Sequence, residues 1–221
     1  NSVNLIARLE EELSSIGYTL NGIVLRISNT PSGKHTRSGK RVTMYGKDSY
    51  IEKMCNCNFS IKSGAFFQVN TEQAEVLYRE ASYGLADASV IWDVYCGTGS
   101  IGLSCIREDQ TLIGIESVPE AVASARLNAR ISGKANAQFI CKLAEKLDPD
   151  EFGLPVPNAV IVDPPRKGMD IGFITSLTRL SPSIISYVSC DPATMARDIR
   201  QIVSSGKYTL ESVQPVDVFA N

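Results

Sequence analysis

The stretch Asp93-Val94-Tyr95-Cys96-Gly97-Thr98-Gly99-Ser100-Ile101-Gly102 indicates the fold of this 221-residue chain. It directly follows the apolar run 90–92, and its glycines form a G-x-G-x-x-G pattern at Gly97, Gly99 and Gly102. Glycines at this spacing allow a tight turn between a strand and a helix, and they let the backbone approach a bound nucleotide closely. The stretch therefore predicts a nucleotide site at the end of a buried strand.

Short apolar runs recur around this stretch and alternate with segments of helical spacing. We expect strands at 90–92, 112–115, 139–140, 159–162 and 184–188, and helices at 71–86 and 118–132. Ser117 and Glu120 form a capping box at the start of the second helix, and Gly133 is placed to end it. Strands that alternate with helices predict an α/β fold, in which a parallel sheet binds its ligand at the carboxyl ends of the strands. This domain is expected to cover residues 71–221.

Residues 1–70 have a different pattern, which predicts a smaller β-rich subdomain. Apolar and polar residues alternate there in short runs, such as 23–27 and 59–61, as they do in strands. Cys55 and Cys57 are expected to be alternate residues on a strand edge. Residues 28–41 form a polar, basic loop, which is either a solvated loop or, in a functional interpretation, an RNA-contacting hairpin tip.

The composition limits the classes of function. The net charge is −2 and the sequence pI is about 5.6. This acidic balance counts against a general nucleic-acid binder, so an RNA substrate would need local positive charge or a part of the protein outside this chain. No apolar run approaches the length that spans a bilayer, and the N-terminus does not resemble a secretory signal. We therefore expect a cytoplasmic protein with no membrane partner.

The cysteine pattern predicts neither a disulfide framework nor a metal site. Six cysteines are scattered along the chain without a C-x-x-C pair, and His35 is the only histidine. Cys105 and Cys141 lie inside apolar segments and are expected to be small core residues. No metal is expected in this chain.

An acidic residue ends the strand that follows the glycine loop. Glu116 lies 19 residues after Gly97, where its carboxylate can accept hydrogen bonds from ribose hydroxyls. This arrangement fits NAD as well as S-adenosylmethionine. Asp93, at the head of the glycine loop, favours S-adenosylmethionine, because a carboxylate attracts its cationic end and would repel a pyrophosphate.

Two later strand ends carry reactive residues. Asp163-Pro164-Pro165-Arg166-Lys167-Gly168 follows the strand 159–162, and its adjacent prolines hold a rigid turn that presents Asp163 and Arg166 to the cleft. Ser189-Cys190-Asp191-Pro192-Ala193-Thr194 follows the strand 184–188, with Asp191 as N-cap and Pro192 at the first helical position. The positive end of a helix stabilises a thiolate beside it, so Cys190 alone has the setting of a nucleophile.

Together these motifs resemble the RNA 5-methyluridine methyltransferase family, which includes bacterial tRNA and 23S rRNA enzymes. Four stretches carry the resemblance in order: Phe66-Phe67-Gln68-Val69-Asn70-Thr71, then 93–102, 163–168 and 189–198. The match spans essentially residues 20–219. It implies a Rossmann-like class I S-adenosylmethionine-dependent methyltransferase fold. It also implies methylation of uridine C5 in RNA, with 23S rRNA favoured over tRNA.

The resemblance also assigns roles to residues of this sequence. Those expected to bind the cofactor, S-adenosyl-L-methionine, are Gln68, Tyr95, Gly97, Gly99, Ser100, Glu116 and Asp163. Asp163 and Arg166 are also expected beside the target base, and Cys190 is similar to the family's nucleophile. A thiolate that adds to uracil C6 turns C5 into a nucleophile, and Arg166 would stabilise the charge that develops on a uracil oxygen.

The chain departs from the family in three places. The glutamate thought to be the general base is expected beyond Asn221, and an RNA-binding barrel, in some members with an iron-sulfur cluster, is expected before Asn1. Lys142-Leu143 stands where relatives often have Gly-Asp, and Ser100 stands where a larger polar residue is common.

Two other functions stay open at this stage. A base-amino methyltransferase, acting on N6 of adenine or N2 of guanine, would carry an aromatic residue at the position of Arg166 and would not need Cys190. A catalytically inactive RNA- or cofactor-binding module would bind the cofactor without a covalent step.

Overall fold

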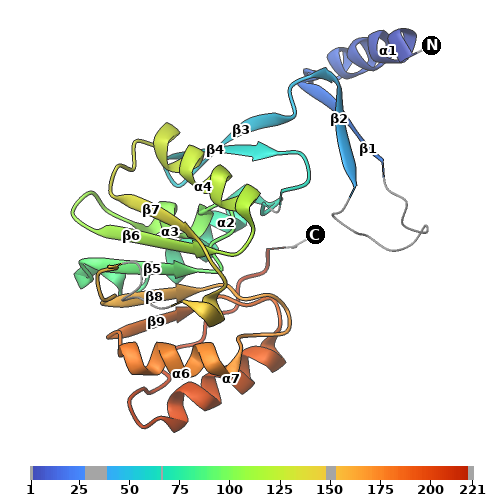
Figure 1. The fold of residues 1–221 in the computed structure, drawn as a ribbon. Coiled ribbons are helices and arrows are strands. Elements are labelled where there is room, and N and C mark those ends of the chain that lie inside the picture. The colour runs from blue at the N-terminus through green and yellow to red at the C-terminus, as the bar shows by residue number, and fades with distance from the viewer. Residues whose placement is uncertain (1, 28–38, 66, 148–152, 219–221) are drawn as a thin grey trace. The chain divides into compact units, whose positions relative to one another are not determined.

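The computed structural model describes residues 2–27, 39–65, 67–147 and 153–218 (Figure 1). The chain forms two compact units, one of Asn1–Glu52 with Ser60–Ala65 and the other of Lys53–Phe59 with Phe66–Asn221. Most of the predicted basic loop falls outside the described residues, and its last two residues, Lys40 and Arg41, begin a strand. Each unit is described by itself below.

The first unit begins with a helix, α1 (Ser2–Ser15), followed by strands β1 (Gly22–Ile27) and β2 (Lys40–Gly46), which pair antiparallel. The prediction of strands throughout residues 1–70 is wrong for α1. Leu5, Leu9 and Leu13 recur at every fourth residue, which is the period of a helix and not of a strand.

Strands β3 (Ser49–Met54) and β4 (Cys57–Lys62) form a separate two-stranded sheet. The turn between them is Cys55-Asn56, and both residues have positive φ angles, 50° and 61°. This is the backbone twist that two-residue hairpin turns require. Cys57 is buried on β4, but the predicted place of Cys55 on a strand edge is wrong, because Cys55 belongs to the turn.

The second unit is built on a five-stranded parallel sheet with the strand order β7-β6-β5-β8-β9 (Figure 1). Its strands are β5 (Val90–Val94), β6 (Thr111–Glu116), β7 (Ala137–Cys141), β8 (Ala159–Val162) and β9 (Ile184–Tyr187). All five predicted strands are thereby confirmed, and so is the α/β fold class.

Helices precede, connect and follow these strands. They are α2 (Thr71–Ala81), α3 (Ser100–Cys105), α4 (Pro119–Ile131), α6 (Ile171–Leu180) and α7 (Pro192–Ser204), with short 3₁₀ turns η1 (Leu85–Asp87) and η2 (Ala144–Lys146). The predicted helix 71–86 is too long, because α2 ends at Ala81 and the chain turns at Gly84, where φ is +77°. Gly133, with φ of +69°, follows the end of α4 as predicted.

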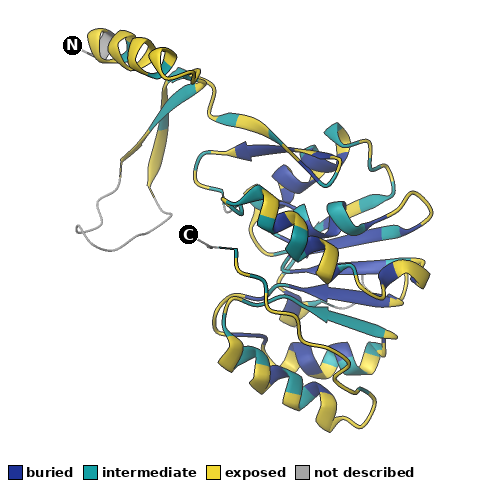
Figure 2. Ribbon diagram, turned by 180° about the vertical axis from the view of Figure 1, so that it is seen from behind, coloured by how far each residue is buried: buried dark blue, intermediate teal, exposed yellow. Residues whose placement is uncertain are grey.

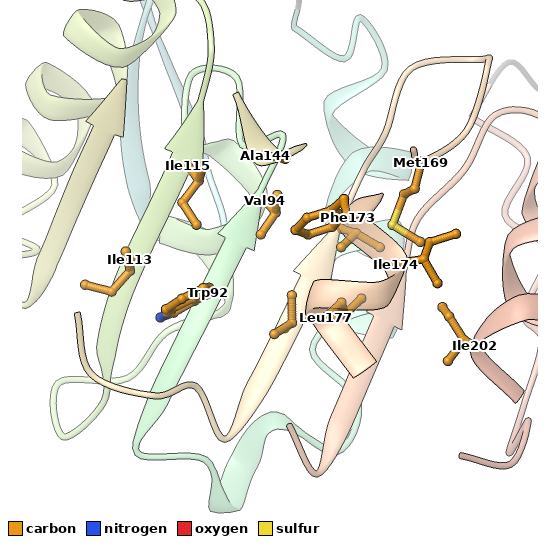
Figure 3. Close-up of a cluster of buried hydrophobic side chains, with 12 residues drawn as sticks. Trp92, Val94, Ile113, Ile115, Ala144, Met169, Phe173, Ile174, Leu177 and Ile202 are labelled. Carbon is orange, nitrogen blue, oxygen red and sulfur yellow. The ribbon is translucent and has the colours of Figure 1, made fainter. Parts of the chain in front are cut away.

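One face of the parallel sheet packs against α6 (Figure 3). Side chains at alternate positions of a strand share a face, so three strands each give two residues to this cluster. The cluster is made by Trp92, Val94, Ile113, Ile115, Val160, Val162, Phe173, Ile174 and Leu177, with Ala144, Met169 and, from α7, Ile202. Figure 2 shows buried residues concentrated in the central strands. The loops at the ends of these strands therefore start from a rigid base.

All six cysteines are free thiols. Cys105 is half-buried, but Cys141 is exposed, so its predicted core position is wrong. Cys141 is the last residue of β7, which lies at the edge of the sheet. Among the described residues, no group of three or more His, Cys, Asp or Glu side chains could hold a metal ion. Within the same residues, no helix is long and apolar enough to cross a membrane.

Candidate active site

The three motif loops leave the sheet at its carboxyl edge, on either side of the point where the strand order reverses. From β5 the chain moves outward through β6 and β7, and it then returns to β8 on the other side of β5. Ligands of open α/β sheets bind at such a switch point. The Asp163 amide donates to the Val94 carbonyl (3.3 Å), and the Val188 amide donates to the Val162 carbonyl (2.8 Å). The sequence motifs are therefore brought together as predicted.

The glycine loop holds an unusual backbone conformation. Tyr95, Gly97 and Gly99 have φ angles of 65°, 55° and 78°. A Cβ atom on Gly97 would meet no atom within 4 Å, whereas one on Gly99 would lie 3.0 Å from the Phe139 ring. The Asn128 side chain donates to the Thr98 carbonyl (3.0 Å) and holds the loop from α4. Gly97 thus presents open backbone, as a nucleotide site requires.

Gly102 has a different role from the one predicted for the glycine pattern. Its amide donates to Asp93 Oδ2 (2.9 Å), and a Cβ atom there would lie 2.6 Å from the same oxygen. A glycine is therefore needed at position 102 because α3 packs closely against Asp93 of β5 there, and Gly102 is not placed for approach to a ligand.

Asp93 lies near the end of β5, just before the glycine loop as predicted, but its side chain is fully buried. Its Oδ1 atom has no hydrogen-bond partner among the described residues. Burial raises the pKa of Asp93 to about 7, and the nearby carboxylates of Asp163 and Glu116 add to the shift. The folded protein therefore holds this carboxyl in its neutral form well above the pH at which an exposed aspartate ionises.

Asp93→Asn is expected to raise the free energy of unfolding at pH 8 by about 1–3 kcal/mol and to leave it nearly unchanged at pH 4. Asp93 in the unfolded chain loses its proton near pH 3.8, but in the folded chain only near pH 7. The wild type therefore loses stability as the pH rises between these values, and an amide, which cannot ionise, avoids that loss. Urea unfolding at the two pH values measures the difference. A substituted protein that is less stable than the wild type at pH 8 would contradict the expectation.

Glu116 is fixed by backbone amides on both of its oxygens. Oε2 accepts from the Gly97 amide (3.1 Å), and Oε1 accepts from the amides of Ser117 (2.6 Å) and Val118 (2.8 Å). The predicted capping box is wrong, because Val118 and not Ser117 is the N-cap of α4. Glu116 accepts from the Ser117 amide, which a capping box would have assigned to the side chain of Glu120. The carboxylate is thereby anchored beside the glycine loop.

Three further residues predicted to bind the cofactor, Tyr95, Ser100 and Gln68, differ in their burial and in their hydrogen-bond partners. The Tyr95 ring packs edge-on against Phe173, with centroids 5.7 Å apart, and its buried hydroxyl has no partner among the described residues. Ser100 Oγ accepts from the Tyr78 hydroxyl (3.0 Å). Gln68 is half-buried and precedes α2. The sequence reasoning missed Tyr78, because its place on the apolar side of α2 is that of a core residue.

The turn at 163–168 carries a half-buried carboxyl, that of Asp163, and an exposed cation. Burial raises the pKa of Asp163 to about 6. The Gly168 amide donates to the Pro165 carbonyl (2.8 Å) and closes the turn, while Arg166 is exposed. The rigid turn that the prolines predict is present.

Cys190 is exposed and lies between β9 and α7. Asp191 is the N-cap of α7 as predicted, and its Oδ1 accepts from the amides of Ala193 and Thr194, both at 3.0 Å. The amide of Thr194, that of Ala193 and the positive charge of Arg166 lower the pKa of Asp191. The charge of Arg166 thus acts on Asp191, the residue after Cys190, and the pairing of β8 with β9 brings the second and third motifs to the same edge of the sheet.

The parallel sheet, with its glycine loop at the switch point, is Rossmann-like, and the comparisons place it in the class of S-adenosylmethionine-dependent methyltransferases. A methyltransferase of this class from Agrobacterium tumefaciens matches 86% of this chain and 67% of its own, with a TM-score of 0.59 and 16% identity, which shows the fold alone. Within this class, the chain belongs to the tRNA (uracil-5-)-methyltransferase family, whose model matches residues 37–220.

Several relatives share much of the sequence. An uncharacterized RNA methyltransferase of Clostridium tetani is 40% identical over 218 residues, which is 96% of this chain and 47% of the relative. One from Staphylococcus aureus is 42% identical over 182 residues, which is 80% of this chain and 40% of the relative. The chain therefore spans a little under half the length of these relatives.

Among solved structures, the tRNA (uracil-54, C5)-methyltransferase of Pyrococcus abyssi in complex with S-adenosyl-L-homocysteine is similar to this chain. The TM-score is 0.72 and the sequence identity 28%, over 85% of this chain and 46% of the Pyrococcus chain.

Proposed function

We propose that this chain catalyses the S-adenosylmethionine-dependent methylation of carbon 5 of a uridine in RNA, with Cys190 as the nucleophile. The observation that carries the proposal is that the glycine loop, the 163–168 turn and an exposed cysteine before a helix meet at one edge of the sheet. Membership of the uracil-5 family and the similarity to the Pyrococcus abyssi enzyme support this reaction type.

The glycine loop has features that fit S-adenosylmethionine. Gly97 leaves open backbone for a close ligand, and the Tyr95 hydroxyl is a buried polar group with no partner among the described residues. The carboxylate of Asp163 suits a ligand with a sulfonium and an ammonium group. The other residues proposed to bind the cofactor are Gln68, Gly99, Ser100 and Glu116. When bound, the cofactor would supply an electrophilic methyl group.

The chemistry proposed for Cys190 makes C5 of uracil nucleophilic. Its thiolate forms a bond to C6, and the electron pair of the C5=C6 bond moves onto C5 and the C4 oxygen. Once C5 carries the methyl group, loss of the C5 proton to a base restores the C5=C6 bond, breaks the S–C6 bond and returns the thiolate. Arg166, close to Asp191, would stabilise the negative oxygen, and Asp163 would lie beside the base.

The RNA substrate must present its target base unstacked, in a loop or flipped out of a helix. The preference for 23S rRNA over tRNA stays a prediction from the sequence. It can be tested with the same chemistry, by offering both kinds of RNA.

The proposal is tested with RNA fragments of both kinds that carry 5-fluorouridine at the candidate positions, together with S-adenosylmethionine. Fluorine at C5 cannot leave as a proton, so the reaction is expected to stall as a covalent adduct that survives a denaturing gel. Trypsin would release residues 180–197 as one peptide, in which Cys190 is the only cysteine, and mass spectrometry would locate the nucleotide on it. Cofactor binding without an adduct on either RNA would contradict the proposal and favour a base-amino methyltransferase or an inactive module.

A further inference from the structure

A buried carboxylate joins the elements on both sides of the 163–168 turn and Cys190. Asp198, in α7, is fully buried. Its Oδ2 accepts from the Met169 amide (2.7 Å) and from the Tyr187 hydroxyl (2.8 Å). Met169 directly follows the turn, and Tyr187 is the last residue of β9, three residues before Cys190. One carboxylate thus contacts the turn, the strand before the cysteine and the helix after it.

The neighbouring arginine extends this connection. Arg197 donates to Asp198 Oδ1 through Nε (2.9 Å) and one terminal nitrogen (2.6 Å). The same terminal nitrogen also donates to the Lys167 carbonyl (2.9 Å). The packing is close, because a Cβ atom on Gly168 would lie 2.4 Å from Arg197 and 2.6 Å from Asp198. We call Arg197 and Asp198 the clamp.

A carboxylate is a costly way to fill this space. Taking a charge out of water costs several kcal/mol, and a buried ion pair often adds no stability over apolar residues of similar volume. What the Asp198–Arg197 pair supplies is a fixed geometry, because each carboxylate oxygen of Asp198 accepts hydrogen bonds only from donors in particular positions. Those donors belong to the segments that carry Arg166 and Cys190. A displacement of about 1 Å in such a site can lower a rate about 100-fold.

We propose that Asp198, together with Arg197, is a positioning residue that holds the 163–168 turn in register with Cys190. This inference rests on the proposed function for its effect on the reaction rate, but the placement of the turn can be measured without RNA. Within the described residues, the hydrogen bonds of the clamp go to Lys167, Met169 and Tyr187 and none goes to the glycine loop, which Asp198 reaches through its charge on Tyr95. The affinity for the cofactor should therefore change little when the clamp is altered.

The first test substitutes Asp198→Asn, which keeps the size of the side chain and leaves one acceptor oxygen where there were two. Whichever way the amide is turned, its NH₂ group faces donors, either Arg197 or the Met169 amide and the Tyr187 hydroxyl. The matched control is Asp109→Asn, which removes the acid of an exposed ion pair with Arg107 (3.0 Å) just before β6, at the amino end of a strand and not at the carboxyl edge that carries the motifs. If Asp198→Asn does not fold, Tyr187→Phe removes a single hydrogen bond of the clamp and is measured in its place.

Two readouts decide the inference. Native trypsin cleavage after Arg166 and Lys167 is expected to be at least about fivefold faster in Asp198→Asn than in the wild type and the control. The rate of covalent adduct formation at saturating 5-fluorouridine RNA is expected to fall about 100-fold. The affinity for S-adenosylmethionine should stay within about twofold of the wild-type value. A folded variant with unchanged cleavage overturns the inference. So does a uniform loss of rate, cofactor affinity and melting temperature, which a purely structural role predicts.

Failure of the proposed function would look different. If the wild type traps no RNA at all, the proposed reaction is wrong, and the cleavage result alone then decides whether the clamp positions the turn.

Discussion

Replacing Cys190 with alanine is expected to abolish the fluorouridine adduct and to lower methyl transfer to RNA by about 10⁴-fold or more, because the proposed mechanism needs the Cys190 thiolate to form the bond to C6. Binding of S-adenosylmethionine should change by no more than about twofold, since Cys190 follows β9 and the glycine loop follows β5. Single-turnover transfer of a labelled methyl group measures the first effect, and calorimetry measures the second.

The matched control is Cys141→Ala, which removes another exposed thiol from the end of another strand of the same sheet. It should keep the adduct and the rate of the wild type. Methyl transfer that survives Cys190→Ala would contradict the nucleophilic mechanism and favour a reaction at an amino group.

Asp163→Asn is expected to lower kcat/KM for S-adenosylmethionine about 100-fold and to remove its dependence on acid pH. Burial raises the pKa of Asp163 to about 6, so the wild type should lose kcat/KM as the pH falls through about 6 and the carboxylate takes up a proton. An amide carries no charge at any pH, so the substituted enzyme should give a low and flat profile in this range. The profile of kcat/KM reports the pKa values of the free enzyme, so it can be compared with the raised pKa of Asp163.

Two comparisons make the assignment to Asp163 specific. Asp109→Asn, at an exposed position, should leave the profile unchanged. An acid limb that persists in Asp163→Asn but disappears in Asp93→Asn would assign the titration to Asp93, whose pKa is raised to about 7.

The parts of the fold that the sequence predicts are those with a local cause. The central strands of the parallel sheet are buried on both faces, so they are short apolar runs such as 159–162 that can be recognised without knowing their partners. The cap of α7 is equally local, because Asp191 binds amides two and three residues ahead of it. The convergence of the motifs then follows from the general rule for strand ends in parallel sheets.

The parts that the sequence does not predict depend on distant partners. Asp198 contacts an amide 29 residues away, and nothing near it in the sequence marks it as buried. Glu116 accepts from the Ser117 amide, the donor that a capping box assigns to Glu120, and α4 begins after Val118 instead. Gly102 fits the nucleotide pattern by its spacing, yet its neighbour in space is Asp93. In each of these cases, the local sequence is compatible with more than one role for the residue, and contacts with distant residues decide which role it takes.

The exposure of Cys190 has a consequence for how the proposed reaction excludes solvent. A carbanion-like C5 is quenched by water, so the thiol must be covered while the adduct exists. On the proposed mechanism, the nucleotides on either side of the flipped base would cover the active site and exclude water from it. A free nucleoside could reach Cys190 but could not seal it. Discrimination against mononucleotides would then arise because they leave the adduct open to water, and it would not require contacts that recognise the RNA sequence.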